Sequence, residues 1–394
     1  MIESESLLTL RTNISEVDWE FASDDTQYLT HNIHRYSGKF IPQIARTAIE
    51  LLTIPGDTVL DPYMGSGTTL IESTLLSRKS VGVDLNPLAV LISKTKVTPI
   101  AEHKLTDLKQ HFLVLCESLD LYFNPTLFIP PIPNIEELIV SAKQDHRYNN
   151  PWYTKWFQNP VLIQLLVLKR EIESLSDQDL IDLATVAFSD ILRRSSNAHT
   201  GYPNVMYDKN AKERALPAKV FYDSLVDVIN KVSTLTQQEF FDAKPVIIHG
   251  DARCLPIQDN SIDAVISHPP YIGAIPYAEY GSLSLGWLGH DWKSLDEALT
   301  GGKRQSSKVV PRFEEGYYEM LSESFRVLKP GKSIFLMVGN PVVRGEIVKL
   351  DEMTEKFAET LGFELIEKAT RKGVNRRANK MGDEVLFFFK KPQG

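Results

Sequence analysis

Acidic residues follow three short apolar runs of this sequence, and a His-Pro-Pro-Tyr tetrapeptide follows a fourth. Asp61 comes after TVL, Asp84 after SVGV and Asp251 after VIIHG, while the tetrapeptide at 268–271 comes after DAVIS. A carboxylate accepts hydrogen bonds from donor groups, and a neutral imidazole accepts one through its unprotonated nitrogen. Two consecutive prolines make a rigid turn. These residue types indicate a binding site with several hydrogen-bond acceptors and a fixed backbone corner.

The first of these runs continues into a glycine-containing loop and then into a helix, in the stretch LDPYMGSGTTL at 60–70. Gly65 and Gly67 allow a ligand to approach the backbone closely, and the helix directs its first amide groups toward that ligand. The loop is not a P-loop, because no lysine follows the second glycine, and the G-x-G-x-x-G spacing of dinucleotide enzymes is incomplete. Asp84, at the end of the next strand, is placed to accept from ribose hydroxyls. The alternative is an ordinary turn residue at a strand end.

Strand and helix patterns alternate near both ends of the chain. TVLDPY and SVGVDLN predict two strands, and PVIIHGDA, DAVISHPPY, KSIFLMVGN, FELIEKA and EVLFFFKK predict further strands later in the sequence. Helical patterns between them imply βαβ units and a mainly parallel sheet, which binds ligands at the carboxyl ends of its strands. The last two strands leave little room for a crossover, so we expect an antiparallel edge. Several helices predicted within 101–244 form an insertion between the second and third strands.

Length and composition limit the classes of protein that this chain can be. With 394 residues and 43% hydrophobic residues, it can form one large domain with an insertion, or two domains. Cys116 and Cys254 form no C-x-x-C pair, so we expect no metal site and a reducing cytoplasm. No apolar run approaches the ~18 residues of a membrane span. We therefore expect a soluble, cytoplasmic protein without a membrane partner.

Four motifs, DPYMGSGTT, GVDLNP, HGDA and SHPPY, resemble those of the S-adenosylmethionine-dependent amino-methyltransferases that modify exocyclic amines of nucleic-acid bases. The upstream stretch HRYSGKFIPQIARTAIELL resembles the segment that packs against the methionine part of the cofactor in the DNA enzymes. The resemblance implies an α/β, Rossmann-like methyltransferase fold with a mainly parallel sheet, an antiparallel edge and a helical insertion. It divides the chain into an N-terminal extension (1–30), a cofactor half (31–100), a helical insertion that is a possible DNA-recognition region (101–244) and a target-base half (245–394).

The resemblance also assigns residues to the cofactor, S-adenosyl-L-methionine. Asp84 would hold the ribose, and Asp251 would accept from the adenine amino group with Ala252 at the ring. The residue-level alternatives are a turn role for Asp251 and an exposed position for Lys39. The assigned set is Lys39, Phe40, Asp61, Tyr63, Gly65, Ser66, Gly67, Thr68, Asp84, Leu85, Asn86, Asp251 and Ala252.

In the same family, the side chain before Pro-Pro and the carbonyl of the first proline accept the two hydrogens of the target amine. The lone pair of that amine is otherwise delocalised into the base. His268 stands where the family usually has Asp, Asn or Ser, with Ser267 one position earlier, so either residue could be the acceptor. Tyr271 would offer a face for stacking of an extruded base. The expected catalytic set is Ser267, His268, Pro269, Pro270 and Tyr271.

The net charge of −8 argues weakly against a polyanionic partner, but basic residues cluster in two stretches, at 301–312 and 368–380. Two further arginines follow in ILRRSSNAH. The alternative for each stretch is a solvated loop. The expected DNA contacts are Arg193, Arg194, Lys303, Arg304, Arg371, Arg376 and Arg377.

Together these features predict a DNA methyltransferase, with the cytosine-N4 type favoured by the context of Pro-Pro-Tyr. An adenine-N6 enzyme, an RNA guanine-N2 methyltransferase and a catalytically silent DNA-binding relative are the alternatives. The expected partners are DNA and a cognate restriction endonuclease of a restriction-modification system.

Overall fold

The computed structural model describes residues 2–39, 41–125, 134–202, 204–238, 244–273, 275–302, 308–372 and 382–393. Its main sheet has the strand order β3-β2-β1-β4-β5-β9-β8. These strands are β1 (Thr58–Asp61), β2 (Lys79–Asp84), β3 (Val246–His249), β4 (Ile262–Ser267), β5 (Leu328–Gly339), β8 (Glu364–Arg371) and β9 (Glu384–Lys390). A separate short hairpin consists of β6 (Val342–Val343) and β7 (Glu346–Ile347).

The sheet is parallel from β3 to β5 and antiparallel at the β5–β9 and β9–β8 pairings. The predicted α/β class with an antiparallel edge is therefore confirmed. Chain order reverses between β1 and β4, since β2 and β3 extend to one side of β1 while β4 and β5 extend to the other. A parallel sheet binds ligands at such a switch point, outside the carboxyl ends of the strands. The ends of β1 and β4 therefore mark the expected site.

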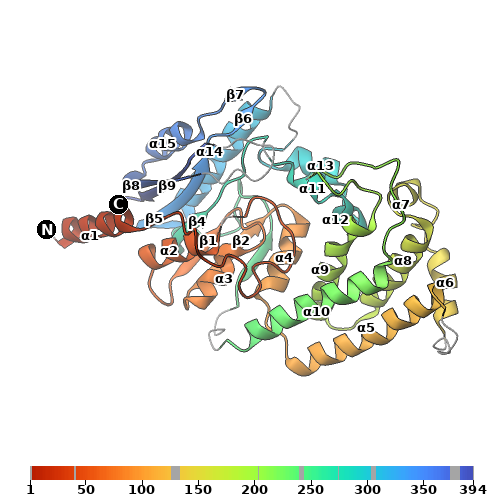
Figure 1. Ribbon diagram of the computed structural model, residues 1–394. Helices are drawn as coiled ribbons and strands as arrows, with labels where there is room; N and C mark the ends of the chain where they lie inside the picture. The colour runs from red at the N-terminus through yellow and green to blue at the C-terminus, as the bar shows by residue number, and fades with distance from the viewer. Residues whose placement is uncertain are drawn as a thin grey trace.

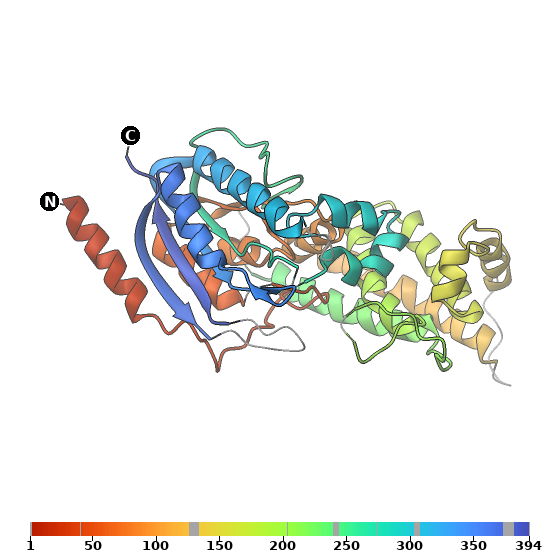
Figure 2. The same cartoon turned by 90° about the horizontal axis from the view of Figure 1, so that it is seen from above.

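Helices cover both faces of the sheet (Figure 1). Val265 of β4 packs in a cluster with α14 (Val309–Val327) and α15 (Leu350–Leu361), whereas its neighbours Ala264 and Ile266 pack with α1 (Ile2–Glu16) and α2 (Pro42–Leu52). This alternation follows from the two-residue period of a strand, and it explains why all of β4 is buried. Figure 2 shows α1 beside β8, the edge strand. No helix among the described residues is long and apolar enough to cross a bilayer.

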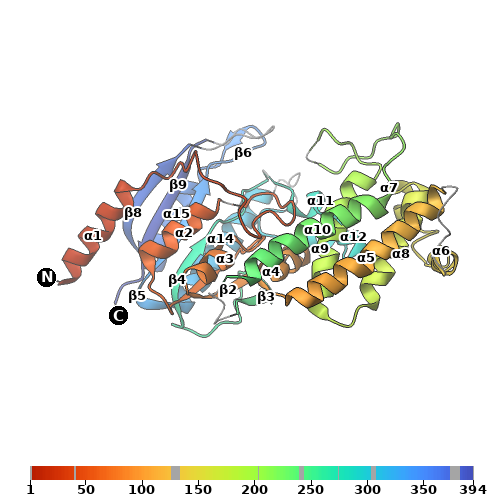
Figure 3. The same ribbon diagram turned by 60° about the horizontal axis from the view of Figure 1, so that its bottom comes forward.

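After α3 (Thr68–Leu75) and α4 (Pro87–Val97), the chain leaves the sheet and forms a group of helices before it returns at β3. This helical group consists of α5 (Glu102–Phe123), α6 (Ile135–Lys143), α7 (Pro151–Trp156), α8 (Asn159–Ser174), α9 (Gln178–Ser195) and α10 (Pro217–Thr236). In Figure 3 the long helices α5 and α10 lie side by side, and they are in contact.

The helical group shares one apolar core with elements of the sheet region. That core joins Phe112, Leu165 and Phe221 of the group to Ile92 of α4 and Trp287 of α12. The connection after β4 consists of α11 (Tyr277–Tyr280), α12 (Ser282–Trp287) and α13 (Trp292–Ala298), which reach toward the helical group in Figure 1. The helical group is therefore packed against the part of the molecule that carries the strand ends.

Candidate active site

The glycine loop after β1 has a backbone that requires glycine. Gly65 and Gly67 have φ angles of +49° and +78°. Residues other than glycine rarely adopt this left-handed region. A Cβ on Gly67 would lie 2.9 Å from Oγ of Ser93 and 3.3 Å from its Cα, so the loop packs tightly against α4. Ser93 Oγ also donates to the Gly65 carbonyl at 2.8 Å. The loop is thus held from α4 with its backbone exposed to the cavity described below.

Asp84 ends β2 and is held by backbone donors. Its Oδ2 accepts from the Gly65 N–H at 2.9 Å and its Oδ1 from the Asn86 N–H at 2.8 Å. Burial raises the pKa of Asp84 to about 6, although these backbone hydrogen bonds act in the opposite direction. The carboxylate has lone-pair sites beyond those that its backbone donors use. It can therefore accept further hydrogen bonds from a ligand.

Asp61 and Ser267 lie at the switch point but face each other. Ser267 Oγ donates to Asp61 Oδ1 at 2.8 Å, and Thr69 Oγ1 donates to Oδ2 at 2.6 Å. Their exposed fractions are 2% for Asp61 and 0% for Ser267, and burial raises the pKa of Asp61 to about 6. Neither lines either of the two cavities described below. This placement differs from the prediction: Asp61 links β1, α3 and β4, and Ser267 is its donor.

Asp251 follows β3 and forms a bidentate ion pair with Arg253. Arg253 Nη2 donates to Asp251 Oδ2 at 2.6 Å, and the backbone N–H of Arg253 donates to Oδ1 at 2.9 Å. Burial acts to raise the pKa of Asp251, but the hydrogen bonds from Arg253 outweigh it and lower that pKa. Asp251 therefore stays a carboxylate and an acceptor, with the small apolar Ala252 beside it.

A cavity of about 70 Å³ brings many of the predicted residues together. Its lining includes the predicted Tyr63, Gly65, Asp84, Leu85, Asn86, Asp251, Ala252, His268 and Pro270. Sequence reasoning missed Tyr36, Leu299 and Thr300, which also line it. Tyr36 belongs to the HRYSGK stretch. An aromatic residue in that stretch could have indicated a contact with the cofactor. Leu299 and Thr300 come from the end of the α13 region, and their sequence offers no comparable signal.

His268 contacts this cavity and also the buried Tyr271. Nε2 of His268 lies 2.6 Å from the Tyr271 hydroxyl, and that hydroxyl donates to Glu384 Oε1 at 2.6 Å. Burial and the positive charge of Arg371 lower the pKa of His268 to about 3, while hydrogen bonding to the backbone of Gly38 opposes the shift. His268 is therefore a neutral imidazole at ordinary pH.

Two predictions at this place need correction. Tyr271 is 3% exposed and buried between His268 and Glu384, so it offers no open face for a base to stack on. Arg371 is 8% exposed and donates to Glu384 Oε2 at 3.1 Å instead of lying on an exposed basic loop. Both residues donate to Glu384, which is buried and therefore needs hydrogen-bond donors. Sequence reasoning missed Glu384.

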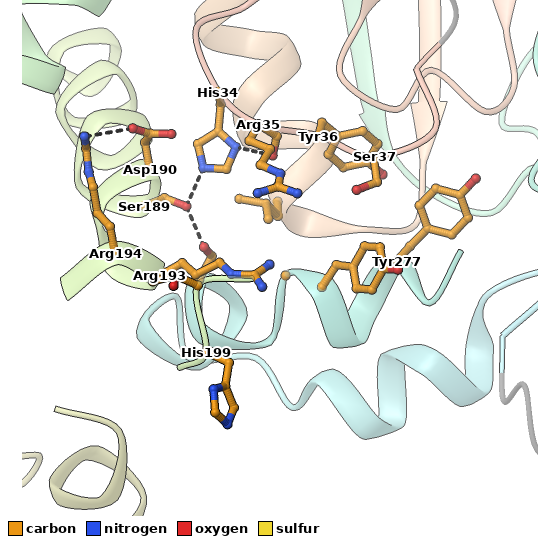
Figure 4. Close-up of a pocket in the computed structure, with 15 residues that line it drawn as sticks. His34, Arg35, Tyr36, Ser37, Ser189, Asp190, Arg193, Arg194, His199 and Tyr277 are labelled. Atoms are coloured by element: carbon orange, nitrogen blue, oxygen red, sulfur yellow. Dashed lines mark hydrogen bonds and ion pairs between the residues drawn. The ribbon is translucent and has the colours of Figure 1, made fainter. Parts of the chain in front are cut away.

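A larger cavity of about 390 Å³ lies between the helical group and the sheet region (Figure 4). It shares Tyr36 and Tyr277 with the smaller cavity, so the two adjoin. His34 reaches Ser189 of α9 at 2.9 Å, and Ser189 donates to Ser284 of α12 at 2.7 Å. These contacts fix one wall of the cavity across three parts of the chain.

The predicted Arg193 and Arg194 line this larger cavity, together with Arg35. Arg194 pairs with Asp190 at 3.0 Å, and Arg193 donates to the Asn204 carbonyl at 3.0 Å. Of the other predicted DNA contacts, Lys303, Arg304, Arg376 and Arg377 lie outside the described residues.

The remaining predicted residues that the structure describes lie before α2, in the glycine loop, at the start of α3 and after β4. Lys39 donates to the His31 carbonyl at 2.6 Å, and burial lowers the pKa of Lys39. Ser66 is 2% exposed and accepts from Lys96 at 3.3 Å. Thr68 is the first residue of α3, and Pro269 is buried. Phe40 lies outside the described residues.

Residues 11–95 match the model of a family described as DNA methylase. M.MvaI of Kocuria varians, a Type II methyltransferase, is 28% identical over 333 residues, which cover 74% of this chain and 65% of that relative. M.MjaII of Methanocaldococcus jannaschii, also a Type II methyltransferase, is 22% identical over 92% of this chain and 81% of its own length. This chain thus spans just under two thirds of the length of M.MvaI.

Solved structures of S-adenosylmethionine-dependent methyltransferases were also matched. One from Methanosarcina mazei covers 88% of this chain and 98% of its own, with 10% identity and a TM-score of 0.37.

Proposed function

We propose, for a chain that belongs to the S-adenosylmethionine-dependent DNA amino-methyltransferase family, that it methylates an exocyclic amine of a base in DNA, with N4 of cytosine favoured. The observation that carries this proposal is the shared cavity. Asp84 and Asp251, the carboxylates suited to a nucleoside, line it together with His268 and Pro270 of the tetrapeptide. A cofactor held by the first pair would meet an amine held at the second.

The donor and acceptor set fits S-adenosylmethionine, the cofactor of this family. Asp84 would accept from the ribose hydroxyls, Asp251 from the adenine amino group, and Ala252 would lie against the ring. The absence of a side chain on Gly65 keeps the loop backbone accessible. Since the cavity measures about 70 Å³ and small-molecule sites usually span roughly 300–1,000 Å³, Tyr36 and Tyr277 at its wall would have to shift on binding.

When bound, the cofactor supplies a methyl group made electrophilic by a sulfonium. The residues of this chain act on the amine, whose lone pair is delocalised into the base. His268 would accept a hydrogen bond from one N–H of the amine, and the carbonyl of Pro269 would accept one from the other. This arrangement localises the lone pair on nitrogen. A neutral imidazole is required for this role, and the low pKa of His268, about 3, provides it. The nitrogen gains the methyl group and loses one proton to water.

The adjoining larger cavity supports a nucleic-acid substrate. A base in a duplex cannot reach the tetrapeptide, so it must be turned out of the stack. The cavity of about 390 Å³ has room for such a base, and Arg35, Arg193 and Arg194 line it with positive charge suited to phosphates. A restriction endonuclease that cuts the unmethylated sequence would match such an enzyme, and this partner stays a prediction.

The test is incubation with methyl-labelled S-adenosylmethionine and, separately, with duplex DNA and with RNA, followed by mass spectrometry of the nucleosides. We expect N4-methylcytosine in DNA. N6-methyladenine would correct the base, and N2-methylguanine in RNA would replace the proposal. An unlabelled DNA that is nevertheless bound would indicate a silent DNA-binding relative. Asp84→Ala is the control, since it should abolish labelling at a cofactor concentration that saturates the wild type.

A further inference from the structure

A hairpin that follows α9 contributes to the wall of the larger cavity. It is formed by the described residues of 197–208. The Asp208 N–H donates to the Asn197 carbonyl at 2.8 Å, and the His199 N–H donates to the Met206 carbonyl at 2.9 Å. His199 and Thr200, in the first arm of the hairpin, line the larger cavity (Figure 4). One part of this hairpin therefore belongs to the cavity that the proposed function assigns to the target base.

The same hairpin exposes three large side chains to solvent. Tyr202, Met206 and Tyr207 have exposed fractions of 56%, 47% and 38%. The ring of Tyr202 packs edge-on against His199, with ring centroids 5.8 Å apart and planes at 83°. Tyr202 is thus adjacent to a residue of the cavity wall. Exposed apolar side chains that cluster in this way indicate a surface that binds a partner.

The backbone of the hairpin is held by two helices of the helical group. Arg193 of α9 donates to the Tyr202 carbonyl and, at 3.0 Å, to the Asn204 carbonyl. The Asn197 N–H donates to the carbonyl of Trp156, the last residue of α7, at 2.7 Å. These hydrogen bonds are made to backbone carbonyls, so none of them depends on the side chain of Tyr202. The ring is therefore presented to solvent on a backbone that is itself fixed.

Basic side chains accompany the exposed rings. Lys155 of α7 is exposed, and its Nζ lies 5.2 Å from the centroid of the Tyr207 ring. Over the described residues 204–216, Lys209 and Lys212 are exposed, and Glu213 is the one exposed acid. Bases stack on aromatic rings, and phosphates attract cations. This combination of rings and lysines suits a nucleic acid as the partner.

We propose that Tyr202 inserts into the base stack of duplex DNA where the target base has left it, and so keeps that base in the larger cavity. This inference rests on the proposed function, in which a base is turned out of the duplex. Turning a base out costs stacking and pairing energy. A side chain that inserts between base steps fills the opened step, and an aromatic ring stacks on the bases beside it.

The position of Tyr202 favours it over its two neighbours. The ring of Tyr207 packs against Trp156, with centroids 5.8 Å apart, so part of its surface is covered. Met206 has no ring with which to stack on a base. Tyr202 is the most exposed of the three and contacts His199 of the cavity wall. A base in the cavity and a ring in the gap that it left would therefore be neighbours.

Single-turnover methylation at saturating DNA and cofactor tests this role. One duplex carries the methylated sequence, which sequencing of the modified DNA identifies. A second duplex has a mispair at the target base, which lowers the cost of turning that base out. Tyr202→Ala should slow methylation of the paired duplex by roughly 10-fold, within the range for losing one stack between a base and an aromatic ring. On the mispaired duplex its rate should stay close to that of the wild type, and Tyr202→Phe should keep the wild-type rate on both.

Tyr122→Ala is the matched control, because Tyr122 is 38% exposed on α5 and lines neither cavity. It should change neither rate, and thermal unfolding of Tyr202→Ala should match the wild type. An equal loss on both duplexes would show a general contact instead of insertion and overturn the proposal. An unchanged rate on the paired duplex would also overturn it, and a loss of self-association in light scattering would then assign the exposed rings to a second copy of the chain. A wild type that methylates no nucleic acid would instead refute the proposed function.

Discussion

Asp84 accepts a hydrogen bond from the backbone N–H of Gly65 at 2.9 Å, which ties the end of β2 to the glycine loop that follows β1. The position of each therefore depends on the other. Gly65 has a φ of +49° within the turn from which its N–H donates to the carboxylate, and Gly65 lines the cavity. The proposed binding of a nucleoside at Asp84 and the access to the loop backbone therefore depend on one arrangement.

Cofactor affinity should fall as the pH drops through about 6. The pKa of Asp84 is raised to about 6 by burial, so below that pH the side chain is protonated and loses acceptor capacity toward the ribose hydroxyls. Above it, the carboxylate is charged and affinity is highest. Calorimetry of S-adenosylmethionine binding between pH 5 and 8 measures this dependence. Asp84→Asn should bind about 2 kcal/mol more weakly at pH 8, since hydrogen bonds to a charged group contribute roughly 1.5–3 kcal/mol each. If Asp84→Asn keeps the wild-type dependence on pH, another group is responsible.

The rate of methyl transfer should not show the titration of an ordinary histidine. An unperturbed imidazole would become protonated near pH 6.5, but the pKa of His268 is lowered to about 3 by burial and by Arg371. The acceptor therefore stays neutral from pH 5.5 to 8. Single-turnover rates at saturating cofactor should give the same profile for the wild type and for His268→Asn. An acid limb that is present in the wild type and absent from the variant would contradict this.

Ser267 and His268 should differ in what their removal affects. Ser267→Ala takes a donor from the buried Asp61 and should lower the free energy of unfolding by about 1–3 kcal/mol, with the single-turnover rate largely retained. His268→Ala should slow that step by ~10²-fold or more. Urea unfolding and single-turnover methylation measure the two effects. A folded, inactive Ser267→Ala beside an active His268→Ala would make Ser267 the acceptor.

Arg371→Met should be strongly destabilising, because it leaves Glu384 as a buried charge without its partner. Breaking a buried pair from one side lowers the free energy of unfolding by about 3–5 kcal/mol. Lys368, three residues earlier on β8, forms an ion pair with Glu355 in which both side chains are exposed, at 45% and 37%. Lys368→Met is thus the matched control and should change stability by less than ~1 kcal/mol. Equal effects in denaturant unfolding would mean that the Arg371 pair is not buried in solution.

Salt dependence tests the larger cavity as a DNA-binding surface. Arg35 and Arg194 are exposed and line it. Replacing both by alanine should reduce the slope of log K against log salt by about 1.8, from ~0.9 per phosphate contact. Cofactor affinity should be unchanged. Lys349→Ala combined with Lys356→Ala removes two exposed charges at the start of α15 and within it, neither of which lines the larger cavity, and should leave the slope unaltered. An unaltered slope in the arginine variant would remove this surface from the proposal.

The fold followed from patterns that are local in the sequence. The β-branched strand runs, the glycine loop and the acids at strand ends depend on neighbouring residues, and a parallel sheet brings such ends together wherever its helices lie. For this reason Asp84, Asp251 and His268, all predicted from strand ends, line one cavity, and their roles stay predictions. The roles of Arg371 and Tyr271 depend instead on Glu384, which joins β8 to β9 and β9 to the tetrapeptide. No local pattern indicates such a contact. The basic stretch at 368–380 was therefore expected on the surface, although its Arg371 is buried.

The apolar core that joins Phe112 and Phe221 of the helical group to Ile92 and Trp287 has an evolutionary consequence. A module that has only a small interface with a catalytic domain can be exchanged between relatives as a unit, and its specificity is transferred with it. Here a graft of residues 101–244 from another protein would have to match side chains on α4 and α12 at the packing density of a protein interior. With residues 101–244 as the predicted DNA-recognition region, the proposed function then implies that changes in target sequence arise by substitution on the exposed surface of the helices rather than by wholesale recombination of the insertion.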